Sequence, residues 1–274
     1  MEPTAHYGCH VVESGRVMKA DRELLVEEPL LILAGERKLA TLMRTPGQEI
    51  ELTIGFLFTE GLIRSTSDLG AVSFCNGREG PANVVRVTPA AGRTLADGGE
   101  HREIFSSCSL CGKETIDTLA RELAVFDKEP ARLSAPAITG LAEEIRARQP
   151  WFRSTGASHA AALALLPLDA RSLGEMIVRE DVGRHNALDK AVGAALGRGM
   201  DLKRAVLLMS GRLSLEMVIK AARAGIRHVA GVSAPTAAAV ELARRLNMFL
   251  AGFTRGASFT VYSCAAALVE AERQ

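Results

Sequence analysis

The strongest constraint on the fold is an alternation of short apolar runs and amphipathic segments in the second half of the chain. From about residue 155, each apolar run leads through a polar loop into a helical pattern, as in AVLLMSG before LSLEMVIKAARAG and RHVAGVS before APTAAAVELARRLN. The series ends with MFLAGF and SFTVYS. Continuous apolar strands that alternate with helices are typical of a mixed or mostly parallel sheet covered on both faces. The sequence therefore predicts an α/β fold.

The first half of the chain has another pattern, which predicts a smaller α+β domain. The segment PLLILAGERKLATLMR predicts a β-hairpin around a glycine-containing turn, and AVSFCNG with ANVVRVTP predicts a second hairpin. Between them, Thr45 as N-cap, Pro46 at the first helical position and Gly61 after the end predict a helix. The apolar face expected for this helix contains Ile50, Ile54, Leu57 and Phe58.

The division between the two halves is expected near a Gly-rich polar stretch, AAGRTLADGGEHRE. With 274 residues, of which 47% are hydrophobic, the chain is long enough for two domains. We predict an N-terminal domain at residues 1–100 and an α/β domain at residues 101–274.

Composition argues against nucleic acid and membranes as partners. The 33 basic and 32 acidic residues leave a formal net charge of +1, so no global field attracts a polyanion. No segment approaches the roughly 20 apolar residues that a transmembrane helix needs. Five scattered cysteines do not resemble a secreted disulfide framework. We therefore expect a cytoplasmic protein.

The loops after the apolar runs carry the residues of an anion site. In open α/β sheets, ligands bind outside the carboxyl ends of the strands. Here these loops are REDVGRHN, SGRLS, SAPT and GFTRG, and they contribute Arg184, Arg212 and Arg255. Guanidinium groups bind phosphate oxygens, and the helices that begin after Ser214 and Pro235 would point backbone N–H groups at the same region. Each loop taken alone also fits an ordinary cap or turn, but three arginines together favour a phosphorylated ligand.

Three polar residues near these loops have two interpretations each. Asp181 and His185 fit a general acid/base pair, and they fit equally a buried carboxylate that binds an arginine or caps the following helix. His159, in STGASHAAALALL, is either a pocket residue or a strand-start histidine with a satisfied hydrogen bond, and we favour the pocket. Neither GxGxxG nor GxxxxGKS occurs in the sequence.

The segment FSSCSLCGK places Cys108 and Cys111 three positions apart, just before a helical pattern. A structural zinc site would need two more ligands, and the sequence has no second CxxC. A dithiol redox centre fits the spacing, but Ser107 stands where a thioredoxin-like pair has an aromatic residue. A sulfur carrier needs an accessible thiol of lowered pKa, which a helix N-terminus next to Lys113 would provide. Two unremarkable thiols in a turn are the remaining possibility.

Together these residues resemble the FdhD/NarQ family, the formate dehydrogenase accessory sulfurtransferases. The resemblance extends over nearly the whole chain and includes the following motifs: LMRTPGQEIELTIGFLFTEGLI, SSCSLCGKETID, STGASHAAAL, VREDVGRHNALDKAVG, SGRLSLEMVIKAARAGI, VSAPTAAAVELA and GFTRGASFTVYS. Two positions depart from the family pattern. Ala157 replaces a second glycine before His159, and Ala34 replaces an asparagine in the first hairpin.

The resemblance implies a sulfurtransferase. Such a protein takes persulfide sulfur from a cysteine desulfurase and transfers it to the molybdenum cofactor, bis(molybdopterin guanine dinucleotide), before that cofactor enters apo formate dehydrogenase. It also implies a cytidine deaminase-like larger domain and a homodimer. Carried over by motif, Cys108 bears the persulfide and Cys111 assists it. The cofactor, or a GDP-like nucleotide in its place, would be held by Phe253, Thr254, Arg255, Gly256, Ala257 and Ser258, with Arg212, His159, Arg184 and His185 nearby.

Two other functions are weighed against sulfur transfer. A zinc deaminase-like hydrolase would need a catalytic Glu two residues after a zinc-binding His or Cys, and then a PCxxC pair. The chain has HAA at 159–161, HNA at 185–187, and Ser107 in place of the proline, so no metal ligand is predicted. The third candidate is a chaperone that binds the cofactor and apo formate dehydrogenase without moving sulfur.

Overall fold

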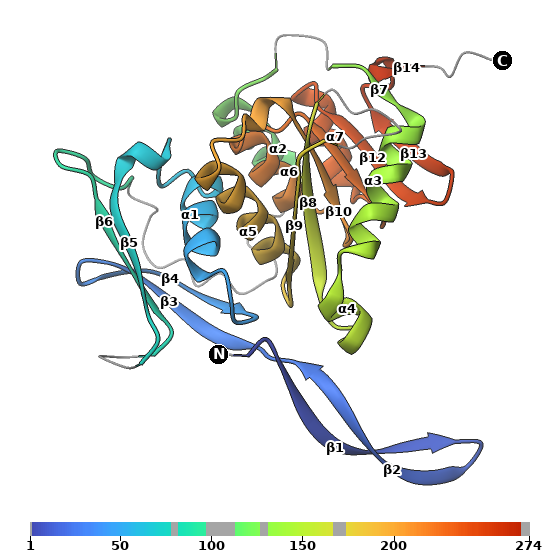
Figure 1. The fold of residues 1–274 in the computed structure, drawn as a ribbon. Coiled ribbons are helices and arrows are strands. Elements are labelled where there is room, and N and C mark those ends of the chain that lie inside the picture. Colours follow the sequence, from blue (N-terminus) through green and yellow to red (C-terminus); the bar gives the residue numbers. More distant parts are fainter. Residues whose placement is uncertain (1, 78–81, 97–112, 127–130, 167–173, 270–274) are drawn as a thin grey trace.

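The computed structural model describes residues 2–77, 82–96, 113–126, 131–166 and 174–269. Two β-sheets, with helices packed on and between them, make up the body, and an N-terminal hairpin projects from it (Figure 1). The predicted boundary near residue 100 lies outside the described residues. Within the described part of the chain, no helix is long and apolar enough to cross a membrane.

The larger sheet has six strands in the order β13-β12-β11-β10-β8-β9. These strands are β8 (His159–Leu165), β9 (Met176–Asp181), β10 (Ala205–Met209), β11 (His228–Gly231), β12 (Phe249–Arg255) and β13 (Ser258–Ser263). Only β10, β11 and β12 run parallel, whereas the pairs β8–β9, β8–β10 and β12–β13 are antiparallel. The sheet is therefore mixed, which is one of the two predicted alternatives, and it is not mostly parallel.

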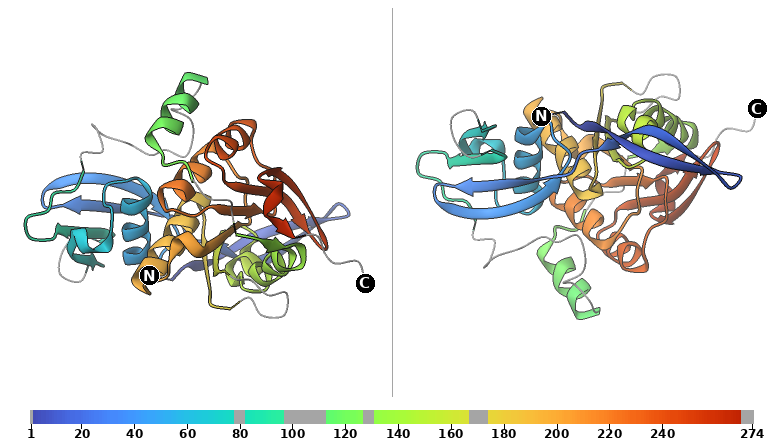
Figure 2. Two further views of the ribbon diagram at one scale, coloured as in Figure 1. Left: turned by 90° about the horizontal axis from the view of Figure 1, so that it is seen from above. Right: turned by 90° about the horizontal axis from the view of Figure 1, so that it is seen from below.

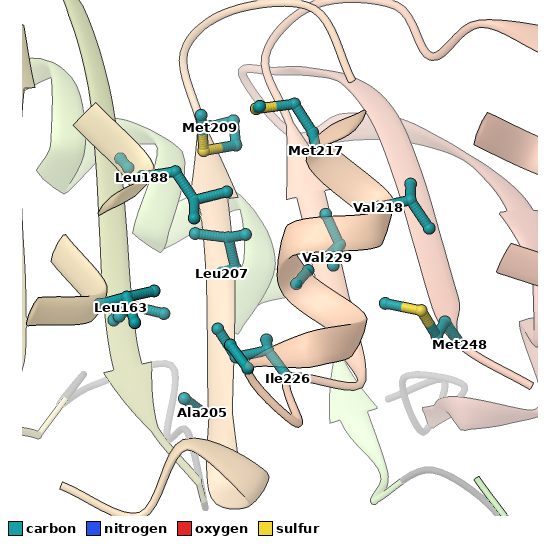
Figure 3. Close-up of a cluster of buried hydrophobic side chains, with 14 of the residues drawn as sticks. Leu163, Leu188, Ala205, Leu207, Met209, Met217, Val218, Ile226, Val229 and Met248 are labelled. Carbon is teal, nitrogen blue, oxygen red and sulfur yellow. The ribbon is translucent and has the colours of Figure 1, made fainter. Parts of the chain in front are cut away.

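Helices cover both faces of the six-stranded sheet, as predicted. On one face lie α5 (Arg184–Gly197), α6 (Leu215–Arg223) and α7 (Ala237–Arg245), and on the other lies α3 (Ala135–Ala147). Successive side chains of a strand point to opposite faces, so Leu207 packs with α5–α7 and Leu208 packs with α3. Figure 3 shows part of the first cluster, in which Leu207 lies next to Leu188 of α5 and Met209 lies next to Met217 of α6. This packing fixes the positions of the first turns of α5, α6 and α7 relative to the ends of the strands.

The smaller sheet confirms both predicted hairpins. Its strands are β3 (Glu28–Ala34), β4 (Arg37–Arg44), β5 (Leu69–Cys75) and β6 (Val84–Pro89), in the order β4-β3-β6-β5. Helix α1 (Glu49–Thr59) lies between this sheet and α5 (Figure 2). It is the element that joins the two halves of the molecule.

The helix predicted after the first hairpin exists, but its start and its buried face differ from the prediction. Helix α1 begins at Glu49 behind a left-handed Gln48, not at Pro46. Thr45 is no N-cap: it is fully buried, and its hydroxyl accepts a hydrogen bond from the Val182 N–H at 3.1 Å. Ile50 is exposed. Because α1 is packed on two sides, its buried residues spread around the helix: Leu52, Thr53, Gly55, Phe56, Leu57 and Thr59.

The N-terminal segment, which has no predicted element, forms a projecting two-stranded hairpin. Strands β1 (Thr4–Glu13) and β2 (Arg16–Leu25) pair along their full length and extend away from the body (Figures 1 and 2). One side of the hairpin exposes Tyr7, Met18 and Leu24. The remaining elements of the described chain are α2 (Lys113–Glu122), α4 (Pro150–Thr155), β7 (Leu133–Ser134), β14 (Leu268–Val269) and three 3-10 turns.

Candidate functional site

Loops from both outer and inner strands meet at one edge of the six-stranded sheet. Because β10, β11 and β12 are parallel, their carboxyl ends share this edge. Strand β8 is antiparallel to β10 and begins here with His159, and β9 ends here with Asp181, directly opposite His159. Helix α5 then starts with Arg184, and the loop after β10 contains Arg212. The topology thus brings together loops that are distant in the sequence.

Arg184 and Arg212 form a pair of neighbouring cations at this edge. Burial and then the charge of Arg212 lower the pKa of Arg184, and Glu216 opposes this effect. The Nε atom of Arg184 is buried and has no hydrogen-bond partner among the described residues. Two guanidinium groups that repel each other and keep an unused donor are suited to a phosphate, which would bind both.

His159 lies against the same pair. A Cβ atom at Gly211 would be 3.1 Å from Nδ1 of His159 and 3.6 Å from Cβ of Arg184. The glycine therefore lets the loop after β10 lie close to the imidazole ring. Burial, followed by the charges of Arg184 and Arg212, lowers the pKa of His159. The structure thus places His159 beside these arginines, while its part in binding stays a prediction.

His185 is also at this edge, where its partner is Glu216 rather than Asp181. The Nε2 atom of His185 lies 2.6 Å from Oε2 of Glu216, a residue in the first turn of α6. This hydrogen bond is the main cause of the lowered pKa of Glu216. The carboxylate also offsets part of the positive charge of Arg184.

The contacts of Asp181 favour the structural one of its two interpretations. It is fully buried and forms an ion pair of 2.7 Å with Nζ of Lys190, which is fully buried as well. Its carboxylate accepts hydrogen bonds from the Gly183 N–H at 2.9 Å, from Asn186 at 2.9 Å and from the Thr45 N–H at 3.2 Å. Asp181 therefore fixes the start of α5, and with it the position of Arg184.

Two buried hydroxyl groups near the edge have no hydrogen-bond partner within the described part of the chain. Ser214 precedes α6 in the N-cap position without capping it, and its Oγ is buried and unpartnered there. The Oγ1 atom of Thr254 is likewise buried without a partner. Thr236, by contrast, caps α7 by accepting a hydrogen bond from the Ala239 N–H at 3.3 Å. Buried polar groups are normally hydrogen-bonded, so the two unused hydroxyls are further candidates for ligand contact.

The segment from Phe253 to Ser258 forms the tip of the β12–β13 hairpin at the same edge. Phe253 is exposed and has a positive φ of 55°, which is unusual for a bulky residue. Arg255 is exposed, and Gly256 and Ala257 form the turn. Strand β11 separates β12 from β10, so about 10 Å of sheet lies between the Arg212 loop and this hairpin. The predicted binding residues therefore form two groups, one around Arg184 and one around Arg255.

Comparison with known proteins identifies the chain's relatives. Residues 25–269 match the FdhD/NarQ family. The chain belongs to this family. The predicted resemblance is thereby confirmed over most of the sequence.

Curated FdhD relatives are similar over nearly their full length. The sulfur carrier protein FdhD of Streptomyces avermitilis is 42% identical over 263 residues, which cover 92% of this chain and 91% of the relative. The sulfur carrier protein FdhD of Sulfolobus acidocaldarius is 39% identical over 254 residues, covering 92% and 93%. A crystal structure from Desulfotalea psychrophila, assigned as a formate dehydrogenase accessory protein, superposes with a TM-score of 0.76. At 22% identity over 98% of this chain and 100% of that one, it shows that the fold is shared.

The two cysteines of the FdhD-like CxxC motif, Cys108 and Cys111, lie outside the described residues. The helix predicted after them is present as α2, which begins at Lys113. Ile116 of α2 and Leu123, the residue after it, pack into the core beneath α5–α7, and Asp117 of α2 pairs with Arg245 of α7. The described residues contain no group of three or more His, Cys, Asp or Glu side chains that could hold a metal ion.

Sequence reasoning missed three residues of the FdhD site region: Lys190, Ser214 as an unused hydroxyl, and Glu216. The role of Lys190 could have been predicted from the sequence, because a lone lysine within the apolar stretch ALDKAVGAA is expected to be buried and to need an acidic partner. Nothing in the sequence marks Glu216 as a site residue, since an acidic residue in the first turn of a helix is common. Its pairing with His185 depends on how α5 and α6 lie together on the sheet.

Proposed function

We propose that this member of the FdhD/NarQ family is a sulfur carrier that serves a formate dehydrogenase. In the proposal, Cys108 accepts sulfane sulfur from a cysteine desulfurase and delivers it to the molybdenum cofactor, bis(molybdopterin guanine dinucleotide), which is the substrate. Support comes from the family match, from relatives named sulfur carrier protein FdhD, and from the CxxC motif ahead of α2.

Loading is a thiol–persulfide exchange. The Cys108 thiolate attacks the outer sulfur of the donor persulfide, the donor S–S bond breaks, and the donor cysteine leaves as a thiolate with the bonding electrons. A new S–S bond now joins Cys108 to the transferred sulfur. Neither protein is oxidised overall, so loading needs no further reagent.

Delivery as sulfide requires two electrons, which the thiols of Cys108 and Cys111 are proposed to supply together. Its thiolate attacks the inner sulfur of the Cys108 persulfide, a Cys108–Cys111 disulfide forms, and the outer sulfur leaves as hydrosulfide toward the metal. The two thiols are oxidised while the sulfane sulfur is reduced. A cellular dithiol then has to reduce the disulfide before the next cycle.

The observation that carries the binding part of the proposal is the cation pair of Arg184 and Arg212 with its unused donor. A guanine dinucleotide contains a pyrophosphate, whose oxygens match the fork of a guanidinium group. The tip of the β12–β13 hairpin would hold another part of the same nucleotide through Arg255 and Thr254. Phe253, exposed at that tip, offers a surface on which a purine would stack.

The partners in this proposal are a desulfurase as donor, apo formate dehydrogenase as recipient, and a second copy of the chain in a homodimer. The proposed compartment is the cytoplasm, where thiols stay reduced. A chaperone without sulfur transfer would bind the same nucleotide but would never carry a persulfide.

Titration with GDP tests the binding site. The parent protein is expected to bind GDP, and Arg184→Gln, Arg212→Gln and Arg255→Ala are each expected to weaken binding about tenfold or more. Arg198→Gln is the matched control, because Arg198 follows the opposite end of α5 and is exposed. Absence of GDP binding, or equal affinity in the three arginine variants, would refute the site.

A further inference from the structure

Within the part of the chain that the structure describes, charged groups from β9, from α5 and from the loop after β10 act on His159. On β9 lies Asp181, at the start of α5 lie Arg184 and His185, and in the loop after β10 lies Arg212. Asp181 favours the protonated imidazole, while the other three disfavour it. Asp181 forms an ion pair with Lys190. The positive charge of Lys190 offsets much of the negative charge of Asp181, which therefore stabilises the imidazolium less. Together with burial, which is the largest effect, the charges of Arg184 and Arg212 lower the pKa of His159 and so favour the neutral ring.

A bound phosphate would reverse this balance. Its negative charge would pair with Arg184 and Arg212, which removes the repulsion that keeps His159 neutral. The imidazolium form could then donate from both ring nitrogens, whereas the neutral ring donates from one only. The loop that contains Arg212 lies close to the ring, because Gly211 has no Cβ atom, which would be 3.1 Å from Nδ1.

We infer that His159 takes up a proton when a pyrophosphate-bearing nucleotide binds beside Arg184 and Arg212, so that the bound anion meets three cations. This inference rests on the proposed function, since it assumes that the site takes such a nucleotide. It makes His159 the residue that couples occupancy of the site to pH. The site should also prefer a fully ionised phosphate. A protonated His159 is repelled by the two arginines, and only a strongly negative ligand offsets this repulsion.

The pH dependence has a definite sign. The folded, empty protein has a lowered pKa at His159, and the bound nucleotide raises it. Affinity therefore increases as the pH falls through the pKa of the complex, and it stops increasing below the pKa of the empty protein. A proton is taken up on binding between these two limits.

The suitable probe is GDP-mannose, a pyrophosphate diester with no ionisation of its own near neutral pH. Calorimetric titrations near pH 7 in two buffers of different ionisation enthalpy give the number of protons taken up on binding. We expect fractional to full uptake of one proton by the parent protein. His159→Gln is expected to bind more weakly at low pH and to show no uptake, and His10→Gln, a change on the projecting hairpin, is expected to behave like the parent.

Histidine ring resonances give a second readout that does not depend on a variant. The pKa of His159 measured by NMR should be higher with GDP-mannose bound than without it. Binding without proton uptake, or uptake that persists in His159→Gln, would overturn the inference while leaving the nucleotide site intact. Failure of both GDP-mannose and GDP to bind would instead overturn the nucleotide-binding part of the proposed function.

Discussion

Gly193 of α5 lies directly against the backbone of Glu51 in α1. A Cβ atom at position 193 would be 1.9 Å from the Glu51 carbonyl oxygen, and one at Gly55 would be 1.8 Å from the Asp189 carbonyl oxygen. The two helices therefore cross through a pair of glycines. An ion pair between Arg179 of β9 and Glu51, with Nε to Oε2 at 2.6 Å, lies at the same junction. This crossing holds the small sheet rigidly against the domain that carries the arginine cluster.

Gly193→Ala is expected to destabilise the protein by about 1–3 kcal/mol or more, because the crossing helices must move apart to admit a methyl group. The midpoint of thermal or urea unfolding measures the loss. Gly197→Ala is the control on the same helix: a Cβ there meets no atom within 4 Å, so a neutral or slightly stabilising effect is expected. Equal stability of the two variants would show that the close crossing does not exist.

Asp181→Asn tests whether Asp181 is structural. Lys190 would keep a fully buried ammonium group without its carboxylate partner, and breaking such a pair typically costs about 3–5 kcal/mol. Urea unfolding measures this cost. Glu144→Gln, which removes the exposed partner of Arg148, should change stability by less than about 1 kcal/mol. A stable Asp181→Asn protein with impaired sulfur delivery would instead favour the acid/base interpretation.

His228 predicts a pH dependence of stability. Burial, with a smaller contribution from the charge of Arg227, lowers the pKa of His228 to about 4. An unfolded histidine has a pKa of about 6.5, so the unfolded chain binds the proton first. The stabilisation is therefore complete above pH 6.5 and is lost as the pH falls toward about 4, with a total of about 3 kcal/mol.

Urea unfolding at several pH values checks the prediction for His228. His228→Gln should lack most of this dependence, since a glutamine N–H can still donate to the Ala131 carbonyl oxygen that His228 contacts at 3.1 Å. Parallel pH profiles for parent and variant would mean that His228 is not the residue responsible.

Local patterns were sufficient to predict the hairpins, most helices and the convergence of the strand-end loops. Each of these depends on neighbours a few positions apart or on a general property of α/β sheets. The direction of β8 and β9 was not predictable in this way, because buried strands have the same apolar pattern in parallel and antiparallel pairs. The projecting hairpin was missed because its exposed strands contain few of the signals that burial imposes.

The parts of the site that the sequence did not reveal depend on long-range contacts. Thr45 looked like an N-cap, but its backbone N–H donates to Asp181, which is 136 positions away. His185 had an apparent partner four positions before it, yet its hydrogen bond is with Glu216, 31 positions later. In both cases the fold supplied a stronger partner than the nearest one in the sequence. The roles of Cys108 and Cys111 stay predictions.

The most direct test of sulfur transfer is the intact mass of the protein after incubation with a cysteine desulfurase and cysteine. The account predicts a gain of one sulfur atom, roughly 32 Da, that is removed by a thiol reductant and is absent in Cys108→Ala. Cys111→Ala should still gain the sulfur and retain it longer in the presence of the cofactor. An unchanged mass of the parent protein, or an equal gain in Cys108→Ala, would contradict a carrier function centred on Cys108.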